Sequence, residues 1–225
     1  MPERGKYIVL EGGDGTGKST QAIILDSFVR SLGYDTLQTV NDETGELEPI
    51  QEPGGTPQAD ILRRRIKDKT IPREPWDNVE WFTEARQYIW RDAIEPALES
   101  GKHVITARSW LSTMAYQGYG EGISLQDIEQ YTRDHVGDAY LEPDFVAILA
   151  IKSEQDRKRR LLARGAATQL DSQADTFESK PAEFQASMQD GYLQLAEERG
   201  IPIIDASGSR IKVFRDILKH VEPLF

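Results

Sequence analysis

The chain of 225 residues has the length of one ordinary domain and can bury enough surface to fold without disulfides. Its 38 acidic and 27 basic side chains give a formal net charge of −11, which argues against binding to duplex nucleic acid or an anionic membrane, because both would repel it. The absence of cysteine excludes disulfides, thiolate nucleophiles and thiolate metal sites, and three scattered histidines do not indicate a zinc site.

No apolar run approaches the length of about 18 residues that a membrane span requires. The first residues, Met1 to Lys6, lead straight into a strand-like segment without an apolar signal region. We therefore expect a cytoplasmic protein whose ligands are small molecules, and not nucleic acid or a membrane.

Short apolar segments alternate along the chain with longer stretches of helical periodicity, the pattern of parallel strands joined by crossover helices. The fourth segment, FVAILAI, does not alternate, as expected of a strand covered by helices on both faces. We predict an α/β fold with a five-stranded parallel sheet. The predicted strands are Tyr7 to Leu10, a weaker one from Thr36 to Val40, His103 to Thr106, Phe145 to Ile151, and Ile201 to Ile204.

The connecting segments carry helix and loop signals. Apolar residues from Ala22 to Leu32 recur at helical spacing and stop before a glycine. The acidic segment 41–48 predicts an exposed loop or small hairpin. A long helix from about Asp77 to Glu99 should kink or divide before Pro96. The polar stretch from Gln169 to Pro181 predicts a mobile segment.

The strongest motif lies between the first predicted strand and the first predicted helix. Residues 12–19 read GGDGTGKS and fit the pattern G-x-x-x-x-G-K-[ST] in the context that this motif demands. The glycines let the backbone wrap around phosphate oxygens, Lys18 neutralises β- and γ-phosphate charge, and the Ser19 hydroxyl suits Mg²⁺. We predict a nucleoside triphosphate site, the alternative being a glycine-rich turn with a chance Lys-Ser pair. The predicted residues are Gly12, Gly13, Asp14, Gly15, Thr16, Gly17, Lys18, Ser19 and Thr20.

Kinases, switch GTPases, motors and transporters share this motif, so the acceptor side has to distinguish them. The turn at 52–56, EPGGT, brings a rigid backbone close to another molecule, or is an ordinary loop before the next helix. Phe82 and Arg86 are four residues apart on one helix face. This pair suits stacking and hydrogen bonding of a base, but on its own it favours a core aromatic beside an arginine that reaches solvent, because most helical aromatics are core residues.

Two further groups of residues suit contacts with phosphate and base. Arg108 stands just beyond the third predicted strand, where open α/β sheets bind ligands. The segment 112–118, STMAYQG, predicts a helix with hydroxyls, a phenol and an amide. Arg157, Arg160 and Arg164 share one helix face and suit a closing lid over the transferring phosphoryl group. In each case a surface salt bridge or a solvated helix face is the alternative.

Taken in order, these motifs resemble the thymidylate kinase family over nearly the whole chain. The EPGGT turn and the S-T-x-A-Y-Q-G helix are much more specific than the phosphate loop, which many enzymes share. The resemblance implies a P-loop NTPase fold with helices on both faces of the sheet, forming one kinase domain over 1–225 with a small mobile lid at about 164–181. It is carried by residues 10–21, 52–56, Phe82 with Arg86, Arg108, 112–118, and Arg160 with 163–165.

The resemblance implies transfer of the γ-phosphoryl group of ATP to the 5′-phosphate of dTMP, with Mg²⁺ held partly by Ser19. It implies catalytic roles for Lys18, Arg108 and Arg164. A phosphate monoester is already a nucleophile, so alignment and charge neutralisation suffice without a His or Ser nucleophile. The donor-site residues that the resemblance adds are Arg160, Ala206 and Ser207, the last two in a loop that lines adenine.

On the acceptor side, the resemblance implies that Phe82 stacks the pyrimidine and that Arg86 contacts its edge. Asp14 would approach the sugar hydroxyl or the metal, and Arg108 would hold the acceptor phosphate. The other acceptor residues that it implies are Glu52, Pro53, Ser112, Tyr116 and Gln117.

The chain departs from the family pattern around the phosphates. Gln51 stands where an arginine usually precedes the EPGGT turn. Ala107 and Ala150 stand where carboxylates are common, and Thr168-Gln169 replaces an Asp-Arg pair in the lid. All of these changes leave fewer charges around the phosphates.

Three interpretations of these departures stay open. Glu11 or Asp14 organises the metal, and Arg63 to Arg65 supply the missing arginine. Alternatively the acceptor differs, as a 5-substituted deoxyuridine monophosphate or a broader set of deoxynucleotides, or the protein is a nucleotide-binding sensor with little kinase activity. The intact phosphate loop, the Phe82–Arg86 pair and Arg108 favour a working dTMP kinase. Related kinases are often dimers, so a homodimer is a further expectation.

Overall fold

The main sheet has five parallel strands, as predicted. The computed structural model describes residues 3–41, 44–151, 153, 155, 156, 159, 177 and 180–225. The strand order is β4-β5-β1-β6-β7. Because the strands are parallel, the loops that follow their carboxyl ends lie at the same edge of the sheet although they are far apart in the sequence. The strands are β1 (Tyr7–Glu11), β4 (Ile50–Gln51), β5 (Val104–Ala107), β6 (Phe145–Ala150) and β7 (Ile203–Asp205).

The prediction of the second strand is wrong. The chain at β2 (Thr39–Val40) pairs antiparallel with β3 (Leu47–Glu48) in a separate hairpin, and Thr36 makes only an isolated bridge. Instead β4 lies beside β5, because Ile50 is fully buried there whereas Val40 is 58% exposed and offers no face to the core. The hairpin agrees with the expectation for the acidic segment 41–48, of which residues 42 and 43 lie outside the described part.

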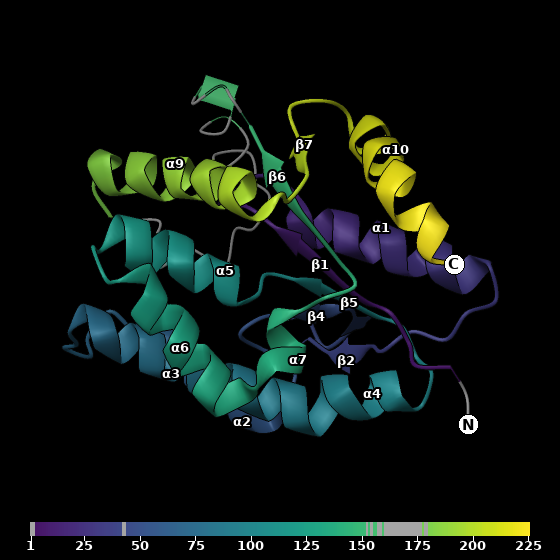
Figure 1. The fold of residues 1–225 in the computed structure, drawn as a ribbon, viewed down its shortest axis with the longest axis horizontal. Helices are drawn as coiled ribbons and strands as arrows, with labels where there is room; N and C mark the ends of the chain where they lie inside the picture. Colours follow the sequence, from purple (N-terminus) through teal and green to yellow (C-terminus); the bar gives the residue numbers. More distant parts are fainter. Residues whose placement is uncertain are drawn as a thin grey trace.

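Helices cover both faces of this sheet (Figure 1). On one face α1 (Lys18–Ser31) and α10 (Arg210–Val221) lie side by side over Ile8 and Leu10 of β1. Tyr7 and Val9 alternate with these residues and pack into the larger layer on the other face. That layer consists of α2 (Pro57–Lys67), α3 (Pro75–Ile89), α4 (Glu95–Glu99), α5 (Trp110–Thr113), α6 (Leu125–Val136), α7 (Asp138–Leu141) and α9 (Ala182–Arg199).

The predicted long helix is divided, as expected. A π-helical turn, η1 (Trp90–Ile94), separates α3 from α4. Pro96 has no N–H to donate and its ring crowds the carbonyl of Asp92, which lies inside that turn. A second π-helical run, η2 (Met114–Gly120), continues α5 and carries most of the STMAYQG motif. A short 3₁₀ turn (Glu222–Leu224) ends the chain.

The lid predicted at 164–181 lies outside the described residues, except for Phe177 and residues 180–181. Arg157, Arg160 and Arg164 lie outside them as well. The site discussed below is therefore built from the sheet edge, the EPGGT turn, α1, α3, α5, η2, α7 and α9.

Candidate active site

The phosphate loop joins β1 to α1 at the carboxyl edge of the sheet. Its glycines at 12, 15 and 17 have φ values of 137°, 82° and 88°, a region that side chains disfavour. A Cβ on Gly12 would lie 2.3 Å from the carbonyl oxygen of Leu149, so only glycine fits. Because α1 begins at Lys18, its first N–H groups have no partner within the helix. The backbone thus has the form of an anion cradle.

Asp14 in this loop contacts two cations at once. Its Oδ1 pairs with the Lys18 ammonium at 3.5 Å and also with the Arg108 guanidinium. Its Oδ2 accepts a hydrogen bond from the Tyr116 phenol at 2.8 Å. Burial raises the pKa of Tyr116, so the phenol stays protonated and can donate. Because one carboxylate binds both cations, Lys18 and Arg108 lie within reach of a single phosphoryl group.

Lys18 is buried beneath the loop and donates to the carbonyl of Gly13 at 3.2 Å. Burial, together with the nearby Arg108, lowers the pKa of its ammonium to about 8, although Asp14 opposes both effects. A bound phosphate would add negative charge and so favour the ammonium form. The charge of Lys18 therefore depends on pH until a phosphate binds.

Arg108 follows β5 in a left-handed backbone conformation, with φ of 76°. Its N–H donates to the carbonyl of Leu10 at 3.0 Å, and the next N–H, of Ser109, donates to Glu11 at 2.6 Å. Its guanidinium also donates to the Ser112 hydroxyl at 3.3 Å. Such strain persists only where the surroundings fix the chain, and it concentrates at functional sites.

The Glu11 carboxylate helps to hold the chain around Arg108 in this conformation. It is fully buried, and each of its oxygens accepts three hydrogen bonds. No acceptor capacity remains for a metal, so the structure contradicts the hypothesis that Glu11 organises Mg²⁺. Its donors are the Ser109 N–H and hydroxyl, the Ser112 N–H and hydroxyl, the Gly12 N–H and the Tyr192 phenol.

Arg86 does not reach solvent, because it is 1% exposed. Its Nε donates to Glu52 at 2.9 Å, its Nη1 to the Thr113 hydroxyl at 2.7 Å and its Nη2 to the Ser109 carbonyl at 2.7 Å. The Tyr140 phenol donates to the same Glu52 oxygen at 2.7 Å. These contacts join α3 to the EPGGT turn, α5 and α7.

The predicted base-binding residues lie around this buried arginine. The Arg86 guanidinium carbon lies 5.3 Å from the ring centroid of Phe82. Gln117, four residues beyond Thr113, is fully buried, and its Oε1 has no hydrogen-bond partner among the described residues. A buried acceptor without a donor is costly, so this oxygen suits an N–H of a bound molecule.

The loop after β7 reaches the same edge of the sheet. Ala206 is fully buried, and its N–H donates to the carbonyl of Ala150 at 2.8 Å. Gln21 of α1 donates to the carbonyl of Arg210 at 3.0 Å, which holds this part of the chain against α1. Ala206 and Ser207 are thus near the start of α1, where the resemblance expects the adenine.

Of the three arginines considered as a replacement at Gln51, Arg63 lies at that turn. Its Nη1 donates to the main-chain oxygen of Gln51 at 3.1 Å. Arg65 instead lies over the ring of Trp81, 4.0 Å from the centroid. The amide of Gln51 donates to Glu48 at 2.8 Å, so it is directed at the hairpin.

Several described residues that contact the predicted site carried no assignment from the sequence, among them Ser109, Thr113, Tyr140, Phe177 and Tyr192. Thr113 lies inside the STMAYQG motif, so its position next to Ser112 could have identified it as a site residue. Tyr140 and Tyr192 come from α7 and α9. Their contacts join elements distant in sequence, which leave no local pattern.

The donor set for a metal is small. Among the described residues, no group of three or more His, Asp or Glu is placed to hold an ion. Ser19 lies in the first turn of α1, and its hydroxyl makes no hydrogen bond to a described residue. Mg²⁺ usually keeps several waters and takes phosphate oxygens beside one or two protein ligands. Ser19 therefore fits a metal that arrives with a nucleotide.

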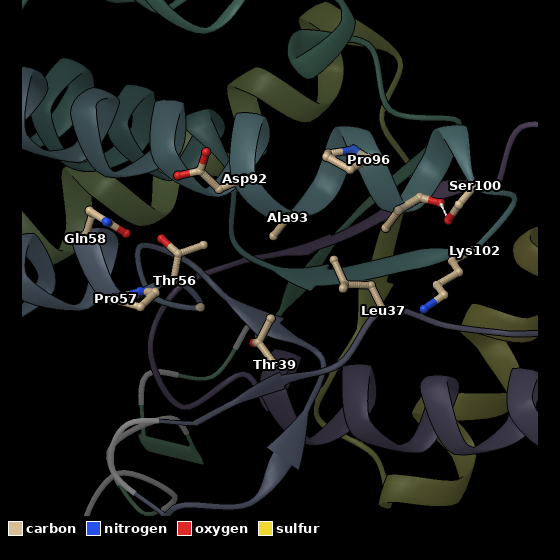
Figure 2. A pocket seen from close by; sticks show the side chains of 12 residues that line it. Leu37, Thr39, Thr56, Pro57, Gln58, Asp92, Ala93, Pro96, Ser100 and Lys102 are labelled. Atoms are coloured by element: carbon tan, nitrogen blue, oxygen red, sulfur yellow. Dashed lines mark hydrogen bonds between the residues drawn. The ribbon is translucent and has the colours of Figure 1, made fainter.

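A separate groove of about 510 Å³ lies away from these residues. It is bounded by the start of α2, by η1 with α4, and by the chain around β2, with Asp92 and Lys102 toward opposite ends (Figure 2). Of the segments predicted to form the site, only the end of the EPGGT turn, Gly55 and Thr56, lines it. The lining residues are Leu37, Thr39, 55–58, Asp92, Ala93, Pro96, Ala97, Ser100 and Lys102.

Comparison with known proteins agrees with the motifs. Residues 10–217 match the family model described as thymidylate kinase. The thymidylate kinase of Pelotomaculum thermopropionicum is 33% identical, over 97% of this chain and 94% of its own, and that of Halothermothrix orenii is 33% identical, over 97% of each. A crystal structure of thymidylate kinase from Ehrlichia chaffeensis has a TM-score of 0.71 at 24% identity, over 97% of this chain and 99% of its own, which shows the fold.

Proposed function

The chain belongs to the thymidylate kinase family, and we propose that it transfers the γ-phosphoryl group of ATP to the 5′-phosphate of dTMP, giving dTDP and ADP. It is accordingly a nucleoside monophosphate kinase. The observation that carries the proposal is that Asp14 pairs with both Lys18 and Arg108. These two cations come from the donor side and the acceptor side of the sheet edge, so both can contact one transferring phosphoryl group.

Phosphoryl transfer needs two phosphates held end to end with their charge neutralised. In this proposal the loop N–H groups and Lys18 hold the donor phosphates, and Arg108 holds the acceptor phosphate. Bound phosphates compete with Asp14 for the two cations, which releases its carboxylate toward the acceptor sugar. Mg²⁺, held by Ser19 with the phosphate oxygens, supplies further neutralisation of charge when bound.

The groups around Phe82 support a thymine or uracil base. Arg86 gives three of its five N–H groups to described residues, which leaves two for a carbonyl on the base edge in this proposal. The unpartnered Oε1 of Gln117 accepts an N–H. Thymine and uracil present an N–H beside carbonyl oxygens, whereas cytosine presents an acceptor at the same ring nitrogen. The base edge therefore favours dTMP, dUMP and their 5-substituted relatives over dCMP.

Further parts of the proposal concern the whole chain. We propose one kinase domain over 1–225 with a lid at about 164–181, in which Arg164 contacts the transferring group and Arg160 the donor. A cytoplasmic location and a homodimer stay predictions from the sequence. Within the described residues no helix combines the length and apolarity needed to cross a membrane.

A coupled assay of ADP release across dTMP, dUMP, 5-substituted analogues, dCMP and purine monophosphates tests the proposal. We expect turnover that depends on the acceptor and is fastest with dTMP. Fastest turnover with a 5-substituted dUMP would identify that nucleotide as the preferred acceptor in place of dTMP. Equal rates across many deoxynucleotides would identify a broad acceptor range. ATP binding without acceptor-stimulated ADP release would instead support the sensor.

Two variants separate the donor and acceptor roles. Lys18→Ala should weaken ATP use and lower turnover, because it removes the cation of the phosphate loop. Arg86→Ala should mainly weaken acceptor recognition. Equal losses of donor and acceptor affinity in both variants, measured by titration, would contradict this division.

A further inference from the structure

A buried acid pairs with the arginine of the proposed base site. Glu52 is 1% exposed and accepts hydrogen bonds from Arg86 and Tyr140 on Oε2, at 2.9 and 2.7 Å. Its Oε1 is buried and has no hydrogen-bond partner among the described residues. The carboxylate therefore binds the guanidinium through one oxygen only, and the acidic group is not saturated in the way that Glu11 is.

The three contacts of Arg86 differ in kind. Thr113 and Ser109 are neutral acceptors for the two terminal nitrogens, whereas Glu52 binds Nε and carries the opposite charge. A guanidinium is a rigid plane, so the contact at Nε sets the direction of the remaining N–H groups. Those groups are the ones available to the base edge beside Phe82.

We propose that Glu52 is a positioning residue for acceptor recognition, which fixes the plane of the Arg86 guanidinium so that its free N–H groups meet the acceptor base. The inference rests on the proposed kinase function. The EPGGT turn then has a role apart from the phosphates: it carries the acid that orients the base-reading arginine on α3.

The surroundings of Glu52 make this role sensitive to pH. Burial raises the pKa of Glu52 to about 7, while Arg86 and the Tyr140 hydrogen bond oppose the rise. The other facing groups are Tyr7 and Glu11 of β1. The ionised carboxylate holds the guanidinium more strongly than the neutral acid does. Binding of the base should therefore strengthen as pH rises through about 7.

The first test compares Glu52→Gln with wild type in the coupled assay. The amide keeps the shape of the side chain and an acceptor for Arg86, but it loses the charge and the titration. We expect the KM for dTMP to rise about tenfold, with kcat and the KM for ATP within about twofold, because a charged hydrogen bond made equally in the ground and transition states is lost. Glu99→Gln, an exposed change of the same kind, should leave all three constants unchanged.

The second test uses thymidine as an inhibitor competitive with dTMP, because it has no phosphate that titrates near pH 6. The wild-type inhibition constant should fall as pH rises from 6 to 8, and that of Glu52→Gln should stay flat. Tyr140→Phe removes a hydrogen bond that lowers the pKa of Glu52, so the midpoint should move to higher pH. A change that only loosened the fold would hydrate Glu52, which lowers its pKa and moves the midpoint to lower pH instead.

These measurements keep the two proposals apart. Absence of acceptor-stimulated ADP release by the wild type would overturn the kinase function itself. Normal wild-type turnover with an unchanged KM for dTMP in Glu52→Gln, or an unchanged thymidine midpoint in Tyr140→Phe, would overturn only the role of Glu52. If Glu52→Gln does not fold, as judged by its thermal melt, the Tyr140→Phe midpoint decides.

Discussion

The ring of Phe177 packs against the ring of Phe82, with the centroids 6.0 Å apart and the planes tilted by 39°. A base inserted between two rings needs about 7 Å, twice the contact distance of carbon atoms. The two rings are therefore too close for a pyrimidine to fit between them. A pyrimidine stacked on one face of Phe82 would have Phe177 beside it and not on its opposite face. Phe177 is 5% exposed, so it forms a wall of this region.

We expect Phe177→Ala to raise the KM for dTMP about three- to tenfold, because an aromatic contact contributes about 0.5–1.5 kcal/mol. The KM for ATP should not change. Steady-state kinetics with each substrate varied in turn measures both constants. Phe184→Ala is the matched control, since Phe184 packs on Tyr116 at 6.2 Å as Phe177 does at 5.7 Å. A lower KM for dTMP in Phe177→Ala would mean that the ring blocks the acceptor site.

The buried Lys18 predicts an alkaline limit for ATP binding. Burial lowers the pKa of its ammonium to about 8, so the free enzyme loses this charge as pH rises above that value. ATP affinity should be level below pH 8 and fall above it, with a proton taken up on binding. Calorimetry from pH 6.5 to 9.5, in buffers of different ionisation enthalpy, measures both effects. Lys18→Ala should bind ATP weakly without this step, and the same step in that variant would assign it to another group.

The contact of Asp14 with Lys18 predicts a shift in the pH dependence of ATP binding when Asp14 is replaced. Its carboxylate raises the pKa of Lys18, so Asp14→Asn should move the alkaline limit of ATP binding to lower pH. The variant should also lose tenfold or more in kcat, because Lys18 and Arg108 lose the partner that aligns them before the phosphates bind, and the acceptor sugar loses the carboxylate that the phosphates release. ATP titrations over pH and turnover at saturating substrates measure the two effects. An unshifted limit together with unchanged kcat would show that the carboxylate has no part in aligning the cations.

Local sequence predicted the phosphate loop because its requirements are local. The glycines at 12, 15 and 17 have the positive φ values that the motif implies, and strand and helix flank them. The prediction of a main-sheet strand at Thr36 to Val40 failed, although its β-forming residues suggested a place in the sheet. The two-residue β4 pairs with β5 instead, because Ile50 fills the core there. Burial of this kind depends on the tertiary structure, so the periodicity of the sequence does not reveal it.

The acceptor side shows the same division. The four-residue spacing placed Phe82 and Arg86 on one face of a helix, and both lie together in the structure. The spacing did not reveal that Arg86 is buried, because its partners come from two other segments of the chain, the EPGGT turn and the start of α5. Glu11 preceded the phosphate loop and suggested a metal ligand. Only the fold shows that six donors already surround it.

Glu52 also predicts how stability depends on pH. Burial raises its pKa from 4.5 to about 7, so between these values the folded protein binds more protons than the unfolded chain. The free energy of unfolding should therefore fall as pH rises through this window, by up to about 3 kcal/mol from this group. Glu52→Gln removes the titrating group, so its loss of stability over the window should be smaller than that of wild type.

Urea denaturation of both proteins at pH 5 and pH 7.5 measures this difference. All other titrating groups are common to the two proteins, so their contributions cancel in the comparison. Parallel changes in wild type and Glu52→Gln would show that Glu52 titrates with the same pKa in the folded and unfolded states.

Alanine substitutions at Gly12 and at Gly122 test the role of the phosphate loop, with Gly122 as the control of similar backbone conformation. Both have positive φ, 137° and 79°, so alanine at either position is strained. A Cβ at Gly122 has nothing within 4 Å, whereas one at Gly12 would meet the carbonyl oxygen of Leu149 at 2.3 Å. Gly12→Ala must therefore move the loop off β6, and its N–H groups leave the phosphates. We expect ATP affinity, measured by calorimetry, to fall at least tenfold in Gly12→Ala and to stay unchanged in Gly122→Ala, and equal affinities would place the donor phosphates elsewhere.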